Sequence, residues 1–220
     1  MSFRESYEEI SRRIEAACQR AGRAPSEVLL LPVSKGHSAE AIGEAADLGL
    51  RVFGESKVQE AKVKIAQCSS RLSWHMIGHL QSNKCRDAVR LFSMIQSVDS
   101  VALAREINKC AEAAGQHMPV LLEVNVAGES SKFGLRPDEV EDAVVEINAL
   151  PRLEIHGLMT IAPYTPAPER VRPFFRQLRE LREACSQRLG VPLPHLSMGM
   201  SGDYEAAIEE GATIVRIGTA

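Results

Sequence analysis

Several features are missing from this sequence, and each absence excludes a class of protein. Lysine and arginine total 26 against 29 aspartates and glutamates, so the net charge is −3 and no basic excess exists to neutralise nucleic-acid phosphates. No run of about 18 apolar residues occurs, which argues against a membrane-spanning helix. The charged amino-terminal segment does not resemble a signal peptide either. We therefore expect neither a nucleic acid nor a membrane among its partners.

Disulfide and metal patterns are missing too. The five cysteines are scattered and include no Cys-x-x-Cys pair, which argues against a disulfide framework or a cysteine zinc site and favours a reducing cytoplasm. His75 and His79 are four residues apart, a spacing that suits a metal pair on a helix. Here they lie along a predicted strand, and no glutamate follows His75. We expect no metal, and we interpret His79 as a structural residue or one that lines the site.

Apolar and charged segments alternate along the 220 residues, of which 45% are hydrophobic and 25% charged, as in ordinary globular proteins. The apolar runs predict eight strands, and the stretches between them have helical spacing. The predicted strands are Val28–Val33, Arg51–Phe53, Trp74–Ile77, Met94–Gln96, Val120–Val126, Leu153–Met159, His195–Leu196 and Thr213–Ile217. The predicted helices begin near Ala39, Lys57, Ser82, Ser100, Pro137, Glu169 and Asp203. A further amphipathic helix, with Phe3, Tyr7, Ile10, Ile14 and Ala17 on one face, opens the chain.

Strands that alternate with helices predict parallel βαβ units, and eight of them predict an α/β fold of the (β/α)8 TIM-barrel type. The length leaves little room for a second domain, so we expect residues 1–220 to form a single barrel domain. We expect the additional N-terminal helix to cover the sheet where a helix after the eighth strand would lie. A doubly wound open sheet is the alternative, but no Gly-x-Gly-x-x-Gly turn follows the first strand.

Functional groups of such barrels collect at the carboxyl ends of the strands, where Lys35 is expected. Lys35 is an even number of residues from Leu29, Leu31 and Val33, so all four side chains are expected on the same face of the strand. A lysine that closes an apolar strand at the barrel mouth is partly desolvated, which favours the neutral amine that attacks an aldehyde. The alternative is a lysine whose stem packs on the strand while its charge reaches water.

Two loops have the chemistry of a phosphate site. Residues 197–203 (Ser-Met-Gly-Met-Ser-Gly-Asp) supply amide groups and hydroxyls just before a predicted helix, whose amino end attracts anions. Gly218 and Thr219 follow the eighth strand, and barrels often hold phosphate with the loops after strands seven and eight. The alternative is a flexible turn with a serine or aspartate helix cap.

Arg216 interrupts an otherwise apolar strand. It cannot lose its charge, so it needs an acceptor. The acceptor is either a carboxylate, such as Glu55 or Glu123, or a ligand atom with a lone pair. A phosphate cradle, an aldehyde-reactive lysine and such an arginine together fit pyridoxal 5′-phosphate (PLP). The lysine would take the aldehyde as a Schiff base, the loops the phosphate and the arginine the pyridine nitrogen.

In combination, these motifs resemble the pyridoxal-phosphate homeostasis protein family, which are alanine-racemase-like barrels without the racemase's second domain. The resemblance extends from about Glu8 to Ala220. It rests on residues 32–35 (Pro-Val-Ser-Lys), 53–60 (Phe-Gly-Glu-Ser-Lys-Val-Gln-Glu), 74–84 (Trp-His-Met-Ile-Gly-His-Leu-Gln-Ser-Asn-Lys), 157–159 (Gly-Leu-Met), 196–201 (Leu-Ser-Met-Gly-Met-Ser) and 215–219 (Val-Arg-Ile-Gly-Thr).

The resemblance implies roles for individual residues. It implies that PLP forms a Schiff base with Lys35 and that Arg216 faces the pyridine nitrogen. It also places Lys132 near the mouth of the site. The residues that it implies for the phosphate are Met200, through its backbone, Ser201, Gly218 and Thr219.

This chain departs from the family pattern at two points. Ser56 stands where the family has asparagine, and its shorter side chain reaches the cofactor less well. The family continues past Gly-Thr-Ala with Ile-Phe-Gly, whereas this sequence stops at Ala220. We therefore expect a truncated end and a loosened contact from Thr219.

The arginine favours a carrier over a catalyst. A guanidinium beside the pyridine nitrogen disfavours its protonation and so weakens PLP as an electron sink. A racemase also needs a second base, for which Tyr7, Tyr164 and Tyr204 offer no strong candidate. We therefore predict a monomer that binds PLP and buffers it or delivers it to apo PLP-dependent enzymes. The alternatives are a weak amino-acid racemase and a barrel that binds another phosphorylated metabolite.

Overall fold

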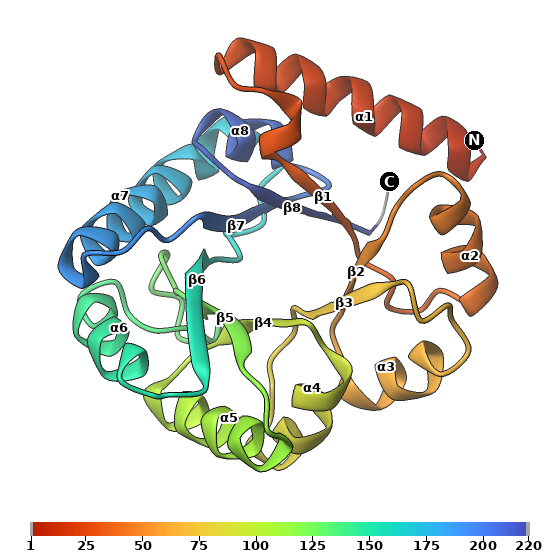
Figure 1. The fold of residues 1–220 in the computed structure, drawn as a ribbon. Helices are drawn as coiled ribbons and strands as arrows, with labels where there is room; N and C mark the ends of the chain where they lie inside the picture. The colour runs from red at the N-terminus through yellow and green to blue at the C-terminus, as the bar shows by residue number, and fades with distance from the viewer. Residues whose placement is uncertain (1, 219–220) are drawn as a thin grey trace.

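The computed structural model describes residues 2–218 of the chain (Figure 1). Within this range, eight α-helices and eight β-strands alternate. The helices are α1 (Phe3–Arg20), α2 (Ala39–Asp47), α3 (Val58–Ile65), α4 (Cys85–Leu91), α5 (Val101–Ala114), α6 (Val140–Asn148), α7 (Arg172–Leu189) and α8 (Tyr204–Glu209). The strands are β1 (Leu29–Pro32), β2 (Val52–Glu55), β3 (Ser73–Met76), β4 (Met94–Val98), β5 (Met118–Glu123), β6 (Leu153–Met159), β7 (His195–Met200) and β8 (Ile214–Ile217). Short 3₁₀ turns lie at Pro25–Glu27, Ser82–Lys84 and Pro168–Val171.

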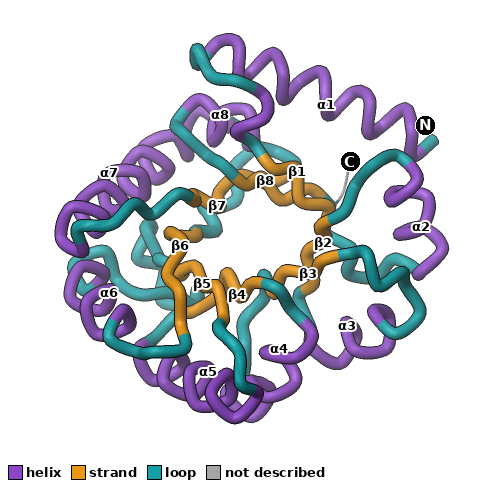
Figure 2. Tube along the Cα trace, in the orientation of Figure 1, coloured by secondary structure: helices purple, strands orange, loops and turns teal. Residues whose placement is uncertain are grey.

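The strands form one parallel sheet that curves into a barrel. Their order is β1-β8-β7-β6-β5-β4-β3-β2, and every neighbouring pair is parallel. The first and last strands in this order, β1 and β2, meet just past the end of β1. There Val33 pairs with Gly54, and the Ser34 amide donates a 3.0 Å hydrogen bond to the Gly54 carbonyl. Figure 2 shows the ring of strands with the helices outside it. The predicted (β/α)8 barrel with an additional N-terminal helix is confirmed.

Helix α5 illustrates how the local sequence sets the helix boundaries. The Ser100 hydroxyl accepts a hydrogen bond from the Leu103 amide at 3.2 Å and caps the first turn. Leu103, Ile107 and Ala111 recur at helical spacing and are buried. Gly115 then ends the helix in the left-handed conformation, at φ 67°. Within residues 2–218, no helix is long and apolar enough to cross a membrane.

Helix α1 covers the sheet between α8 and α2 (Figure 1). Its apolar stripe places Ile10, Ile14 and Ala17 in the core. At its edge, Arg13 Nη2 lies 2.6 Å from Glu205 Oε1 of α8. The helix thus lies where we expected it to take the place of a helix after the eighth strand.

The barrel interior is part apolar and part polar. A cluster of apolar side chains lines it, comprising Leu31, Ile77, Met94, Leu121, Met159 and Ile214. Since residues two apart in a strand share a face, Gln96 and Arg216 also point inward, one step beyond Met94 and Ile214. The polar part therefore extends toward the carboxyl ends of the strands. The outer face of the sheet packs against the helices in a separate, larger cluster.

Strand β7 is longer than the sequence predicted. We expected a strand over His195–Leu196 and a loop from Ser197, but β7 continues to Met200 and pairs with both β6 and β8. Serine and glycine have weak strand propensity, which indicated a loop, and pairing with the two flanking strands overrides that propensity. As a consequence, Ser197 belongs to the barrel wall, and only residues 201–203 remain for the loop before α8.

Gly157 is expected to be essential for the pairing of β6 with β7. A Cβ at this position would lie 1.9 Å from the His195 carbonyl oxygen, whereas a Cβ on Gly43, inside α2, would meet nothing within 4 Å. We predict that Gly157→Ala lowers the free energy of unfolding by about 3 kcal/mol or more, and that Gly43→Ala raises it by up to about 1 kcal/mol. Denaturant unfolding of both variants measures this, and equal stability of the two would contradict the packing at Gly157.

Candidate functional site

The predicted site residues lie on strand ends and loops at one end of the barrel, because parallel strands place all their carboxyl ends together. In chain order, the described ones are Lys35 after β1, Ser56 after β2, His79 after β3, Lys132 between β5 and α6, Met200 at the end of β7, Ser201 after it, Arg216 in β8 and Gly218 after β8. Thr219 lies outside the described residues.

Lys35 lies in a tight turn directly after the pair that closes the barrel. The His37 amide donates a 3.0 Å hydrogen bond to the Ser34 carbonyl, and Gly36 has φ +76°, a turn geometry that favours glycine. The Lys35 side chain is exposed, and its amine makes no hydrogen bond within residues 2–218. Our expectation of partial desolvation was therefore wrong, because the turn places the lysine beyond the packed part of the strand.

Arg216 is a buried cation inside the barrel, with 4% of its surface exposed. Its Nη1 donates a 2.7 Å hydrogen bond to Ser197 Oγ, and its Nη2 donates one of 2.7 Å to the Thr160 carbonyl. Burial lowers the pKa of Arg216 to about 10, against the opposing effect of the Glu123 and Asp203 carboxylates. The guanidinium therefore remains charged at neutral pH.

A chain of hydrogen bonds continues from Arg216 across the barrel. Ser197 Oγ donates to Gln96 Oε1 at 2.6 Å, and Gln96 Nε2 lies 2.8 Å from His75 Nδ1. Burial and the charge of His195 lower the pKa of His75 to about 4, so the imidazole is neutral and Nδ1 accepts from the Gln96 amide. Each donor in the chain thus points away from the arginine. This series of hydrogen bonds was not predicted from the sequence. The positions of His75 and Gln96 on the inward-facing side of their strands could have indicated it.

Glu123, at the end of β5, is a buried carboxyl near Arg216. It is 6% exposed, and its side-chain carboxyl makes no hydrogen bond within residues 2–218. Burial and the charge of Asp99 raise its pKa to about 7, although Arg216 acts in the opposite direction. The sequence had left Glu55 or Glu123 open as a carboxylate partner of Arg216. Neither accepts a hydrogen bond from the arginine, so that alternative is wrong.

Glycines permit close packing around the corner between β7, α8 and β8. Gly199 has φ +93°, and a Cβ there would come within 2.6 Å of a side chain of α8. A Cβ on Gly218 would lie 3.1 Å from the Val33 Cβ. The Met200 amide donates a 2.6 Å hydrogen bond to Asp203 Oδ1. That bond has to be exchanged before the Met200 amide can hold an anion.

His79 and Lys132 make contacts between the loops around the site. The His79 ring stacks on Phe133, with the ring centroids 3.6 Å apart, and its Nδ1 lies 3.0 Å from Asp99 Oδ2. Lys132 Nζ donates a 3.3 Å hydrogen bond to the Ala162 carbonyl. The loop between β5 and α6 therefore contacts the loops that follow β3 and β6.

Ser56 is fixed through its backbone. A Cβ on Gly78 would lie 2.4 Å from the Ser56 carbonyl oxygen, so the segments after β2 and β3 touch at this point. The Ser56 side chain is half-buried, and its hydroxyl makes no hydrogen bond within the described part of the chain. The hydroxyl is therefore available to a ligand.

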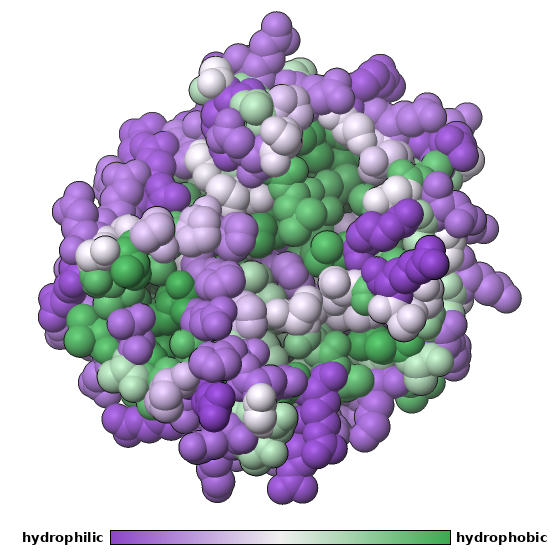
Figure 3. Space-filling view, in the orientation of Figure 1, coloured by the Kyte–Doolittle hydropathy of each residue, from purple (hydrophilic) through white to green (hydrophobic). Residues whose placement is uncertain are grey.

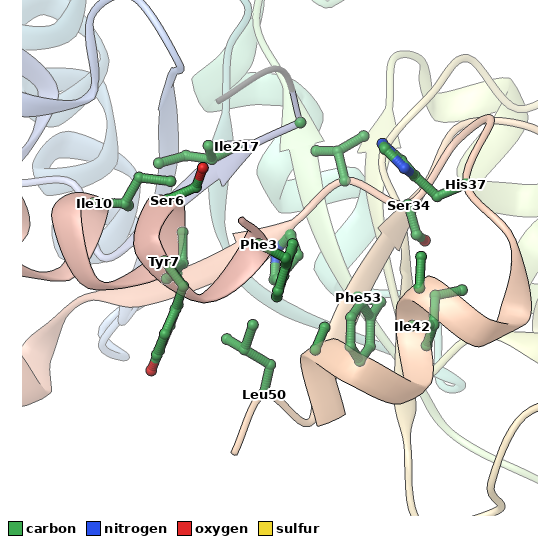
Figure 4. A pocket seen from close by; sticks show the side chains of 16 residues that line it. Phe3, Ser6, Tyr7, Ile10, Ser34, His37, Ile42, Leu50, Phe53 and Ile217 are labelled. Carbon is green, nitrogen blue, oxygen red and sulfur yellow. The ribbon is translucent and has the colours of Figure 1, made fainter. Parts of the chain in front are cut away.

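A small apolar pocket of about 120 Å³ lies between α1, α2 and the outer face of β1. Figure 4 shows Phe3, Tyr7 and Ile10 of α1 on one side of it and Ile42 of α2 on another. Figure 3 shows apolar residues in a hollow beside α1. The lining includes neither Lys35 nor Arg216, and the volume is below the roughly 300 Å³ at which ligand sites begin. We do not assign a ligand to this pocket.

Comparison with known proteins places this barrel in a family. Residues 6–220 match the family described as "Alanine racemase, N-terminal domain", and the chain belongs to it. The chain is also 46% identical, over 220 residues, to a protein of Aquifex aeolicus named "Pyridoxal phosphate homeostasis protein", with 100% of this chain and 96% of that protein covered. The protein of that name from Escherichia coli K12 is 41% identical, over 94% of this chain and 90% of its own. Within the family, the chain is therefore a member of the pyridoxal phosphate homeostasis proteins.

Solved structures agree with this assignment. PipY of Synechococcus elongatus "with PLP bound" has a TM-score of 0.82 and 39% identity, over 96% of this chain and 98% of its own. A protein of Bifidobacterium adolescentis has a TM-score of 0.91 and 37% identity, over 96% and 91% of the two chains. Alanine racemase of Clostridium difficile, at 17% identity and a TM-score of 0.68 over 94% of this chain and 54% of its own, shares the fold.

We expect Glu123 to make stability depend on pH. Its pKa is about 7 in the folded state against about 4.5 when unfolded, so the folded state favours the protonated carboxyl. The resulting stability is fully present below pH 4.5 and is lost as the pH rises through 7. At about 1.4 kcal/mol per pKa unit, the loss is at most ~3 kcal/mol.

Denaturant unfolding at pH 5 and pH 8 measures this loss. The wild-type protein should lose more stability between the two pH values than Glu123→Gln does. Equal losses in the two proteins would show that Glu123 is not held in a buried site.

Proposed function

We propose that this protein binds pyridoxal 5′-phosphate and takes part in the intracellular homeostasis of that cofactor, holding it and releasing it to other proteins. The observation that carries the proposal is Arg216, a buried arginine fixed by Ser197 and Thr160 at the end of the barrel that also carries Lys35. Relatives of 38–46% identity are named pyridoxal phosphate homeostasis proteins, and the related PipY structure contains PLP.

The residues at this end of the barrel fit the cofactor. Lys35 offers an amine without a hydrogen-bond partner in the described chain, in reach of an incoming aldehyde. Ser201 and Gly218, together with Thr219 and the Met200 backbone, would hold the phosphate, and the Ser56 hydroxyl would contact the ring. When bound, PLP supplies an aldehyde that reacts reversibly with amines and a ring that withdraws electrons.

Arg216 would face the pyridine nitrogen with a free donor. Nη1 and Nη2 each donate one of their two hydrogens, to Ser197 and Thr160, and Nε makes no hydrogen bond within residues 2–218. An arginine can only donate, so the ring nitrogen beside it can only accept and stays unprotonated. The electron-withdrawing power of the ring is then weak, which supports holding the cofactor rather than transamination.

The tyrosines do not supply the second base that racemisation requires. Tyr204 is 2% exposed beneath α1, with Arg13 over its ring, and Tyr7 lies on α1. Tyr164 is 93% exposed and has no hydrogen bond in the described chain to hold it over the site. These positions favour a carrier over a racemase.

We also propose that residues 1–220 act as a single PLP-binding domain, as a monomer in the cytoplasm, and that apo PLP-dependent enzymes receive the cofactor. All five cysteines are free thiols, which suits a reducing compartment. The large exposed apolar side chains are spread over α1, α3, α6 and several loops, which supports a monomer.

Reduction with borohydride followed by mass mapping tests the proposal. Purified protein with added PLP should develop an absorbance band near roughly 420 nm, typical of PLP bound to a lysine. Borohydride should remove the band and leave the label on Lys35. Lys35→Ala should lose the covalent label, whereas Lys109→Ala, on the exposed side of α5, should keep it. A wild-type protein without a band, or with its label spread over surface lysines, would refute the proposed site.

Proton exchange separates a carrier from an enzyme. We predict that the PLP-loaded protein at high concentration in heavy water does not catalyse exchange of the α-hydrogen of L-alanine above the rate of free PLP. The reason is the weak electron sink beside Arg216 and the missing second base. NMR of the alanine signal measures the exchange, and rapid deuteration that Lys35→Ala abolishes would favour the racemase.

A further inference from the structure

A second buried cation, Lys64 of α3, lies beside the turn that carries Lys35. Its side chain is 8% exposed, and its ammonium group has an acceptor for each of its three hydrogens. Nζ lies 2.6 Å from the Ser34 carbonyl, 2.6 Å from Glu55 Oε1 and 3.0 Å from Glu60 Oε1. Burial alone would lower the pKa of Lys64, but the bonds to the two carboxylates outweigh it and the pKa is raised. The lysine is therefore a charged group at the junction of β1, β2 and α3.

These side chains hold the residues on both sides of Lys35. Ser34 Oγ donates a 2.7 Å hydrogen bond to Glu55 Oε1, and the Ser34 carbonyl accepts from Lys64. On the other side, the Gly36 amide donates a 2.6 Å hydrogen bond to Glu60 Oε1. The backbone of the turn is thus fixed immediately before and after Lys35, while the Lys35 side chain remains free.

Stability alone does not account for this arrangement. Glu55 is 0% exposed, and its Oε2 has no hydrogen-bond partner among residues 2–218. A buried ion pair with an unpartnered oxygen gains little over apolar side chains of similar size and often costs stability. Its position beside one exposed turn points instead to a role in fixing that turn.

We propose that Lys64, Glu55 and Glu60 are positioning residues that hold the Ser34–His37 turn so that the Lys35 amine meets the aldehyde of the ligand. The inference rests on the proposed function, since it requires Lys35 to be the anchor. It concerns the covalent step only, in which the amine adds to the aldehyde and water leaves. Under the proposed function the phosphate and the pyridine nitrogen would be held by β7, β8 and their loops, to which these three side chains make no hydrogen bond within residues 2–218.

A pair of ligands separates an effect on the covalent reaction with Lys35 from an effect on non-covalent binding. PLP has the aldehyde, and 4′-deoxypyridoxine 5′-phosphate has the same ring and phosphate without it. In Lys64→Met combined with Glu55→Gln, which removes both buried charges, capture of PLP should slow about ten- to hundredfold, since misplacing a reacting group has effects of that size. The affinity for the deoxy compound should change by less than about twofold, because the hydrogen bonds of Lys64 and Glu55 go to the Ser34 turn and to Glu60, not to Arg216 or the Ser56 hydroxyl. The double variant should have a stability close to that of the wild type, because it removes the desolvation cost of two buried charges together with their attraction.

Substitutions of Glu60 test the same inference with less disturbance of the core, because its side chain is partly exposed. Glu60→Gln keeps an oxygen for the Gly36 amide and should capture PLP at close to the wild-type rate. Glu60→Ala removes that oxygen and should capture it more slowly, with unchanged affinity for the deoxy compound. Gln59→Ala, at an exposed neighbouring position of α3, is the control and should behave as the wild type.

Two results would overturn the inference. One is an unchanged capture rate in the double variant and in Glu60→Ala. The other is a parallel loss of affinity for both ligands, which would mark a merely structural role. If the double variant does not fold, equal rates for Glu60→Ala and Glu60→Gln are sufficient to reject it. A wild-type protein that binds PLP without a label on Lys35 would instead refute the proposed function, and this inference with it.

Discussion

The site depends on a positive charge that the barrel interior cannot discard. Arg216 is buried and stays charged, so it must be surrounded by acceptors, and Ser197 and Thr160 supply them. Ser197 accepts from Arg216 and directs its own hydrogen to Gln96, and Gln96 in turn donates to a neutral His75. The polar side chains on the inner face of β3, β4 and β7 are thereby linked by hydrogen bonds to Arg216 of β8. The two hydrogen bonds to Ser197 and Thr160 use two of the five N–H donors of the guanidinium, so under the proposed function the others would be available to a ligand.

The closure of the barrel and the Ser34–His37 turn involve neighbouring residues of the sequence. The sheet closes where Val33 pairs with Gly54 and where the Ser34 amide reaches the Gly54 carbonyl. Lys35 follows directly after Ser34, whose amide takes part in this closure and whose hydroxyl donates a hydrogen bond to Glu55, the next residue of β2. The lysine combines a turn held on both sides with an exposed side chain, which suits the role that we propose for it as the anchor of a ligand. The apolar pocket beneath α1 lies behind this seam and has different chemistry.

The sequence predicted the elements well and the side-chain networks poorly. Apolar runs and helical spacing predicted eight strands and the opening helix, since burial on a sheet or helix face leaves a local pattern. Strand β7 was predicted too short because Ser197 and Gly199 belong to a strand only through their neighbours. The contacts of Lys64 and Gln96 join segments up to about a hundred residues apart, as between Gln96 and Ser197, and depend on strand register. Lys35 and Arg216 were predicted as site residues because each interrupts an apolar pattern, and that role remains a prediction. The exposure of Lys35 was not predicted, because it follows from a turn and not from the alternation of faces along a strand.

The most direct measurement is a crystal structure of this protein grown with PLP. Electron density should run unbroken from Lys35 Nζ to the ligand, with the pyridine nitrogen within hydrogen-bond distance of Arg216 and the phosphate in the corner between β7, α8 and β8. A ligand turned with its phosphate toward Arg216, or bound in the apolar pocket beneath α1, would contradict the assignment of these residues.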